Sequence, residues 1–359
     1  MKNNFVIINL LNYVTDDVMD LKLDLLTDRL TEIKNNNQHA LICHFVENYC
    51  WGYYIYEKHN HDLILLDNLR QLLKEYDIKY HFLFDALYEG QHKIDNTDDI
   101  IFVNYAMLLT YDFIFLRNNK FNTKWEPNNK KGLFLCGKGS KVNRAFLLRK
   151  LYQNDLLDSF TWSFNNNKKE LDIIRQDFAD YTDEQWNKFL EDCTRNLDLS
   201  SEYIEKNNFF QHDGFPVDVS LYNNNLYSLI SETHFSEKLV RIGEKTWRTI
   251  INNHPFLMAG CFRTLVELRK MGFKTFDNYA EIKTYDLAAD SDERINLIVE
   301  NCKSFMTNLH NNQTEVQKDI TYNYHKLLEY CMLYSNRLTK TLDCSEHIVS
   351  QIIYEFKLP

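Results

Sequence analysis

The chain of 359 residues contains little glycine and little proline, with only 9 and 4 of each. This scarcity argues against disorder, collagen-like repeats and long flexible linkers. Tyrosine and phenylalanine are plentiful instead, at 22 and 24, and 44% of the residues are hydrophobic. Because the chain is longer than most domains built around a single hydrophobic core, we expect two folded domains.

The sequence also lacks cysteine pairs and long hydrophobic runs. None of the eight cysteines forms a Cys-x-x-Cys pair, and most lie within apolar runs, which is typical of reduced core thiols. The N-terminal run FVIINLL is too short to span a membrane, and no signal-peptide cleavage site of small residues follows it. We therefore expect a cytoplasmic protein without a membrane span, located in the host cytoplasm if the chain is viral.

The chain has fewer basic than acidic residues, 41 lysines and arginines against 51 aspartates and glutamates, which gives a formal net charge of -10 at pH 7. A large surface that binds nucleic acid without regard to sequence needs clustered lysine and arginine, and the acidic total disfavours such a surface. The composition leaves room for a local basic cleft.

In the first half of the chain, short apolar runs alternate with segments whose leucines recur at helical spacing. This alternation predicts a Rossmann-like parallel sheet. No G-x-G-x-x-G motif follows the first strand, so dinucleotide binding is disfavoured here. The expected elements are a strand at 5–11, a helix at 20–33, a strand at 40–46, a helix at 63–76, and strands at 80–84, 100–103 and 113–116.

Polar side chains follow several of these strands. Glu47 comes after the second strand and Asp85 after the third. A carboxylate at the end of a parallel strand can act as a general base, although polar loop residues are more often simply solvated.

The segment WEPNNKK, residues 125–131, reads as a linker between an N-terminal domain at 1–128 and a C-terminal domain at 129–359. A strand at 133–136 follows, then a turn with Gly137 and Lys138, and then a helix that Asn143 is expected to cap. With Arg144 adding charge, the turn resembles a phosphate-binding loop, although the Walker A spacing is absent. Such turns often hold no ligand.

The stretch from Leu226 to Asp277 reads as strand, helix, strand and helix. Because the carboxyl ends of parallel strands and the amino ends of the following helices meet at one edge of a sheet, its charged and polar residues are expected to gather there. The residues concerned are Ser231, Glu232, Thr233, Glu244, Lys245 and Arg248. The pairs Glu237–Lys238 and Glu244–Lys245 also have a simpler interpretation, as solvated ion pairs that contribute little.

Five motifs in this stretch occur in a recognisable order, namely ISET, GEKTWRTI, NHPF, TLVEL and GFKTF. Together they resemble the donor half of nucleotide-sugar glycosyltransferases of the GT-B fold, and are most similar to the fucosyltransferase-like group with its phage and bacterial relatives. The resemblance covers about half of the chain, from Leu133 to roughly Phe305. It implies an α/β protein with two Rossmann-like domains facing across a cleft. One departure is Gly243, where the group usually has threonine.

The resemblance also implies roles for residues in the second half. Glu244 and Lys245 would contact the ribose and the phosphates of the donor, with Arg248 nearby and Glu232 in the same pocket. Gly137, Lys138 and Arg144 would meet the diphosphate from the other side. The first domain would then carry the acceptor, with Glu47 and Asp85 as candidates for the catalytic base.

These implications point to a hexosyl- or pentosyltransferase that uses a nucleoside-diphosphate sugar as co-substrate and needs no other cofactor. A helix N-terminus with lysine and arginine can stabilise the diphosphate leaving group, and no DxD-like motif stands at a suitable strand end, so transfer is expected to be metal-independent. The acceptor is either a glycan or glycolipid, or a hydroxymethylated DNA base if this is a phage enzyme of DNA modification.

Two other classes of function stay open. The first is a non-catalytic nucleotide-sugar-binding or structural protein that keeps the donor fold but lacks a base. The second is a phosphatase or kinase that uses the turn at Lys138, which is disfavoured because acidic metal ligands are missing nearby.

Overall fold

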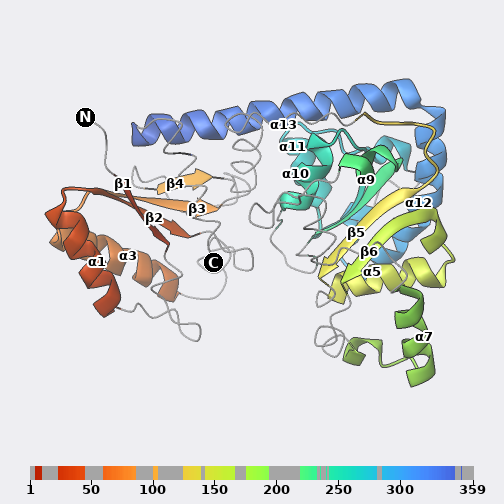
Figure 1. The fold of residues 1–359 in the computed structure, drawn as a ribbon, viewed down its shortest axis with the longest axis horizontal. Helices are drawn as coiled ribbons and strands as arrows, with labels where there is room; N and C mark the ends of the chain where they lie inside the picture. The colour runs from red at the N-terminus through yellow and green to blue at the C-terminus, as the bar shows by residue number, and fades with distance from the viewer. Residues whose placement is uncertain are drawn as a thin grey trace. The chain divides into compact units, whose positions relative to one another are not determined.

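The computed structural model describes residues 5–9, 23–44, 60–85, 100–103, 124–138, 142–165, 175–193, 219–232, 235, 240, 242–280, 285–343 and 349. The chain separates into two compact units, one of residues 1–119 with 330–359 and the other of residues 120–329 (Figure 1). The sequence-based division into domains 1–128 and 129–359 stays a prediction.

The first unit contains a fully parallel sheet of four strands. The strands lie in the order β1 (Phe5–Asn9), β2 (His39–His44), β3 (Tyr80–Asp85) and β4 (Ile100–Val103). Two helices, α1 (Leu23–Asn35) and α3 (Asn60–Glu75), connect the first three strands and lie on the same face of the sheet (Figure 1). A strand order that advances in one direction places right-handed crossovers on one face. The expected strand–helix alternation is therefore confirmed, and the expected strand at 113–116 lies outside the described residues.

The core of the first unit lies between this sheet and its two helices. Strand residues Val6, Ile8 and Phe82 pack against Leu30 of α1 and Leu73 of α3. Leu41 and Leu83 point to the opposite face, because side chains alternate along a strand, and they are also fully buried. Both faces are thus covered, which explains why these strands are continuous apolar runs rather than alternating ones.

The second unit contains another four-stranded parallel sheet with a different topology. Its strands are β5 (Gly132–Lys138), β6 (Phe160–Asn165), β7 (Tyr227–Ser231) and β8 (Phe256–Ala259), in the order β6-β5-β7-β8. The chain therefore builds the sheet outward from β5 in one direction and from β7 in the other. Such a reversal is a topological switch point, where the loops after the two central strands diverge to opposite faces.

Helices cover both faces of the second sheet. The crossover helices are α5 (Val142–Gln153), between β5 and β6, and α10 (Glu244–Ile251), between β7 and β8. α12 (Ser291–Asn311) packs on α5 and β8, on the side of the sheet away from α10 (Figure 1). The remaining helices are α7 (Asp183–Cys193), α9 (Val219–Asn223), α11 (Thr264–Lys270) and α13 (Gln313–Leu342).

Side-chain contacts fix two local segments of the second unit. Thr182 and Gln185 form a capping box at the start of α7, with reciprocal backbone-to-side-chain hydrogen bonds. The segment WEPNNKK, however, is not a free linker, because Trp125 is buried and donates from Nε1 to the carbonyl of Leu226 at 2.7 Å. Among the described residues, no helix combines the length and apolar character needed to cross a membrane.

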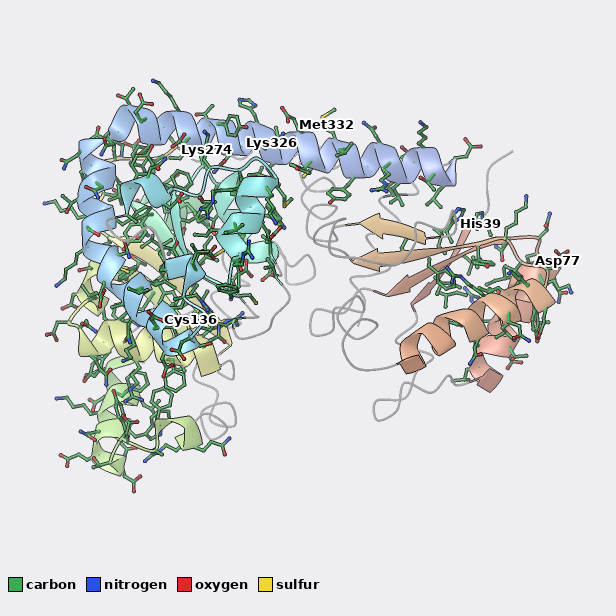
Figure 2. The ribbon with its side chains drawn as sticks, turned by 180° about the vertical axis from the view of Figure 1, so that it is seen from behind. His39, Asp77, Cys136, Lys274, Lys326 and Met332 are labelled. Atoms are coloured by element: carbon green, nitrogen blue, oxygen red, sulfur yellow. The ribbon has the colours of Figure 1, made fainter. Side chains whose placement is uncertain are left out.

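Two histidines have low pKa values in the fold. His254 is buried, with Nδ1 lying 2.8 Å from Ser228 Oγ and Nε2 lying 2.8 Å from the carbonyl of Asn225, which requires Nε2 to be the protonated nitrogen. Burial lowers the pKa of His254 to about 4. For His39 (Figure 2), whose Nε2 lies 2.9 Å from His81 Nδ1, burial and the neighbouring His81 lower the pKa to about 4.

These histidines are expected to make the protein less stable as the pH falls from 7 to 5. Both imidazoles bind protons more readily in the unfolded chain, where the pKa is about 6.5, so the stability present above that pH is lost as the pH falls toward 4. For buried His254 the loss in unfolding free energy is on the order of 2 kcal/mol between pH 7 and pH 5. Urea unfolding at the two pH values measures it, and His254→Gln should show a smaller loss. Equal losses in the wild type and the variant would contradict this assignment.

Candidate functional site

The carboxyl ends of β5 and β7 form the edge of the second sheet at its topological switch point. In open α/β sheets this is where ligands bind. The helices that follow the two strands, α5 and α10, both begin at this edge, so the first N–H groups of two helices, which have no partner within the helix itself, lie near it. The charge of Glu244 interacts with those of Arg144, Lys245 and Arg248, so these four residues lie together at this edge, whereas Thr233, also expected here, lies outside the described residues.

Glu232 is the residue that joins the elements of this edge. It follows β7 directly and is only 2% exposed. Its carboxylate Oε1 accepts hydrogen bonds from the backbone N–H of Gly243, at 3.0 Å, and from the hydroxyl of Thr246. Its backbone N–H donates to Ala259 of β8 at 2.9 Å, and its carbonyl accepts from the side-chain amide of Asn143 at 3.1 Å. The Glu232 carboxylate therefore fixes the N-terminus of α10 against the end of β7.

Gly243 has a steric reason to be glycine. A Cβ atom at this position would lie 2.6 Å from Glu232 Oε2, which is closer than non-bonded atoms approach. The backbone of Gly243 is extended, so close approach rather than a left-handed conformation imposes the requirement. Glycine replaces the threonine of the resembling group here, and the missing side chain leaves room for the Glu232 carboxylate.

Lys245 lies on the first turn of α10, and its Nζ donates to the carbonyl of Ser231 at 2.9 Å. Burial, assisted by the charge of Arg144, lowers the pKa of Lys245 to about 8. The thiol of Cys136 on β5 (Figure 2) interacts with the same two cations, although burial raises its pKa to about 12. The Lys245 ammonium therefore loses its proton only slightly above neutral pH.

The two carboxylates of the site are shifted in opposite directions. Burial and the neighbouring Glu244 raise the pKa of Glu232. Burial alone would also raise the pKa of Glu244, but Arg248, Lys245 and Arg144 together hold it below its usual value. Three cations thus face two carboxylates, one of which is biased toward its neutral form. With the two helix N-termini, the arrangement favours an anionic ligand.

Asn143 is positioned differently from the expectation that it caps a helix. It lies within the first turn of α5, which begins at Val142, and its side-chain amide donates to the Glu232 carbonyl instead of accepting from the helix. The expectation of an N-cap is therefore wrong. The physical reason is that the strand end of β7 offers a buried carbonyl, which needs a donor.

Several predicted site residues lie partly or wholly outside the described part of the chain. Gly137 and Lys138 end β5, so their backbone belongs to this edge of the sheet, but the side chain of Lys138 is not described. Asp85 ends β3 in the first unit, again without a described side chain, and Glu47 lies outside the described residues. The roles of Glu47 and Asp85 as candidate bases stay predictions.

Sequence reasoning missed Thr246, whose buried hydroxyl shares the Glu232 carboxylate with Gly243. The available signal was its place next to Lys245 on the first turn of a helix, facing the residue that ends the preceding strand. In the described part of the chain, no group of three or more histidine, cysteine or acidic residues is placed to hold a metal ion. The metal-independent mechanism stays a prediction.

Comparisons of the chain with protein-family models, with curated proteins and with solved structures found no match.

Proposed function

We propose that this protein is a glycosyltransferase that moves a sugar from a nucleoside-diphosphate sugar to an acceptor hydroxyl. The observation that carries the proposal is the convergence of Arg144, Lys245 and Arg248 with the N-termini of α5 and α10 at a topological switch point. The GT-B arrangement, with a second Rossmann-like domain that binds the acceptor, is part of this proposal.

The chemistry of the donor fits the charges of the site. As the glycosidic bond to the diphosphate breaks, negative charge develops on the leaving oxygen, and preorganised cations and N–H groups stabilise it. Lys245 and Arg144 supply the cations on α10 and α5. Glu244, whose lowered pKa keeps it ionised, supplies a carboxylate that can accept hydrogen bonds from the ribose hydroxyls.

In this proposal Glu232 acts on α10 and not on the donor. Its carboxylate is occupied by Gly243 and Thr246, so it holds the first turn of α10 in place while Lys245 meets the phosphates. A carboxylate of the first unit, Glu47 or Asp85, would remove the proton of the acceptor hydroxyl.

The proposal is tested with a panel of radiolabelled UDP-, GDP- and ADP-sugars, incubated with glycans, glycolipids and hydroxymethylated DNA. We expect transfer to one acceptor class, or slow hydrolysis of one donor without acceptor. Donor binding without transfer or hydrolysis would favour a non-catalytic nucleotide-sugar-binding protein. Absence of both binding and turnover across the panel would overturn the proposal.

The DNA acceptor is tested separately, because the net charge of -10 disfavours it. Binding to hydroxymethylated duplex DNA that falls steeply with salt would favour DNA modification. Absence of binding at low salt would leave the glycan or glycolipid.

A further inference from the structure

The loop that follows β8, residues 260–263, starts at the same edge of the second sheet as the cations of the candidate site. Ala259, the last residue of β8, pairs with Ser231 in the sheet, and its carbonyl accepts from the backbone N–H of Glu232 at 2.9 Å. The carbonyl of Ser231 in turn accepts from Lys245 Nζ at 2.9 Å. The loop therefore begins one strand away from the Lys245 ammonium.

This loop also leads to the same face of the sheet as α10 does. Figure 1 and Figure 2 both show α11 beside α10, on one face. The ring of Trp247 on α10 packs with its centroid 5.5 Å from that of Phe273, which follows α11. Because the two helices follow neighbouring parallel strands, they begin side by side at the carboxyl edge of the sheet. The loop at 260–263 is thus a neighbour of the first turn of α10.

Hydrogen bonds fix the backbone of the loop. The N–H of Arg263 donates to the carbonyl of Asp286 at 2.9 Å, and the buried Asp286 carboxylate accepts from two N–H groups of the first turn of α11, at 3.0 and 3.1 Å. The hydroxyl of Thr264 donates to the carbonyl of Cys261 at 2.7 Å. The first N–H groups of α11 therefore have partners within the protein, and what the loop offers a ligand is its side chains.

Two side chains of this fixed loop have no use in the described fold. Arg263 adopts a left-handed conformation with φ 67°, which is unfavourable for a residue with a Cβ atom. Such strained residues persist where the surrounding structure imposes them, and they cluster at ligand sites. Phe262 is 36% exposed and Arg263 is exposed, and neither side chain makes a hydrogen bond, ion pair or ring contact among the described residues. A strained turn thus presents a ring and a guanidinium beside the candidate site.

We propose that Phe262 and Arg263 bind the nucleobase of the donor, which stacks on the Phe262 ring with the Arg263 guanidinium against it. This inference rests on the proposed function, and it concerns the part of the nucleotide that the cations of the site do not bind. An aromatic ring stacks on any base because every base has a π-face, and a guanidinium adds a cation–π contact. The loop adds affinity for the base, whereas Arg144 and Lys245 bind the diphosphate.

The test compares ligands with and without a base. Calorimetry on the full-length chain measures the affinities for UDP, GDP, ADP and inorganic pyrophosphate, which carries phosphates only. In Phe262→Ala we expect the affinity for the nucleotide that the wild type binds most tightly to fall about tenfold, the scale of one lost stacking contact, with the pyrophosphate affinity unchanged. Phe262→Tyr keeps the ring and should keep the nucleotide affinity.

Arg263→Gly separates the guanidinium from the backbone of the loop. Glycine adopts the left-handed conformation without strain, which offsets its greater freedom in the unfolded chain, so the variant should unfold at about the same urea concentration. The nucleotide affinity should fall about threefold, and the pyrophosphate affinity should not change. Loss of pyrophosphate affinity in this variant would place Arg263 on the phosphates and overturn its contact with the base.

Tyr322→Ala provides a matched control. Tyr322 on α13 is also an exposed aromatic residue, at 45%. Its hydroxyl lies beside Gly272, which comes after the C-terminal end of α11, whereas the loop at 260–263 precedes the N-terminal end. The control should leave the affinities for nucleotide and pyrophosphate unchanged.

The outcomes separate the failure of this inference from the failure of the proposed function. If the wild type binds pyrophosphate and binds no nucleotide more tightly, or if Phe262→Ala behaves like Tyr322→Ala, the contact with the base is overturned while a diphosphate site remains. Equal losses of nucleotide and pyrophosphate affinity in Phe262→Ala would overturn it as well, because the ring would then support the whole site. If the wild type binds none of the four ligands, the proposed function fails and the inference fails with it.

Discussion

Replacing Lys245 with alanine is expected to lower the rate of sugar transfer at least about 100-fold, the scale of removing one preorganised donor to a developing negative charge. Lys245 Nζ lies at the carboxyl end of β7, 2.9 Å from the carbonyl of Ser231, and burial holds its pKa at about 8. In this environment the cation interacts with a diphosphate more strongly than it would in water. The rate is measured with the donor and acceptor identified from the labelled panel.

The loss should be confined to the site. Lys245 contributes one hydrogen bond to a carbonyl, so Lys245→Ala should change the unfolding free energy by about 1 kcal/mol. Lys318→Ala, which removes an exposed lysine on α13 paired with Glu315, is the control and should keep full activity. The affinity for UDP or GDP should also fall as the pH rises through about 8, because Lys245 then loses its charge. A Lys245→Ala protein with full donor affinity and turnover would remove this residue from the mechanism.

Replacing Glu232 with alanine is expected to reduce the unfolding free energy by about 3 kcal/mol, because two buried donors lose their acceptor. These donors are the backbone N–H of Gly243 and the hydroxyl of Thr246. Glu232→Gln keeps an oxygen acceptor in the same place, and burial already shifts the carboxyl toward its neutral form. The glutamine variant should therefore lose no more than about 1 kcal/mol.

The contrast between alanine and glutamine separates two roles of Glu232. If it positions α10, as its contacts suggest, glutamine should preserve most of the affinity for UDP or GDP, and alanine should not. Equal loss of nucleotide affinity in both variants, with similar stability, would instead make the negative charge itself a ligand of the donor. Urea unfolding and calorimetry on the same samples provide both values.

Gly243→Ala displaces the same carboxylate by a different route. The new Cβ would stand 2.6 Å from Glu232 Oε2, so the carboxylate must move away from the N–H of Gly243. The expected cost is about 1–2 kcal/mol, in the range of small-to-large changes in packed sites.

Much of the fold follows from short-range patterns. Buried parallel strands appear as continuous apolar runs, and amphipathic helices as leucines at helical spacing, so the alternation in both halves could be predicted. The gathering of Glu244, Lys245 and Arg248 was also predictable, since residues that open the helix after a parallel strand share one edge of the sheet.

The contacts that give these residues their roles could not be predicted. The order of β6-β5-β7-β8, which creates the switch point, depends on which strands pair across the sheet. The sequence alone presents Trp125 as part of a linker, because its partner, the carbonyl of Leu226, lies 101 residues away in the sequence. Arg294, whose guanidinium donates to the carbonyl of Phe235, gives no local signal either, because the two residues are 59 positions apart. Periodicity reports which face of an element is buried, but not which distant group covers it.

Gly243 shows how the structure changes the meaning of a sequence feature. Compared with the resembling group, Gly243 lacks the hydroxyl of the usual threonine. In the structure it is the residue that lets the Glu232 carboxylate reach the first turn of α10. The hydroxyl that completes this arrangement comes from Thr246, three residues further along the chain.

The central claim is that the edge of the second sheet, at the ends of β5 and β7, binds the diphosphate of a nucleotide sugar. A crystal structure of the full-length protein with UDP or GDP tests this most directly. We expect the diphosphate beside Lys245 and Arg144, at the N-terminus of α10. Ordered nucleotide at another place, with this edge unoccupied, would contradict it.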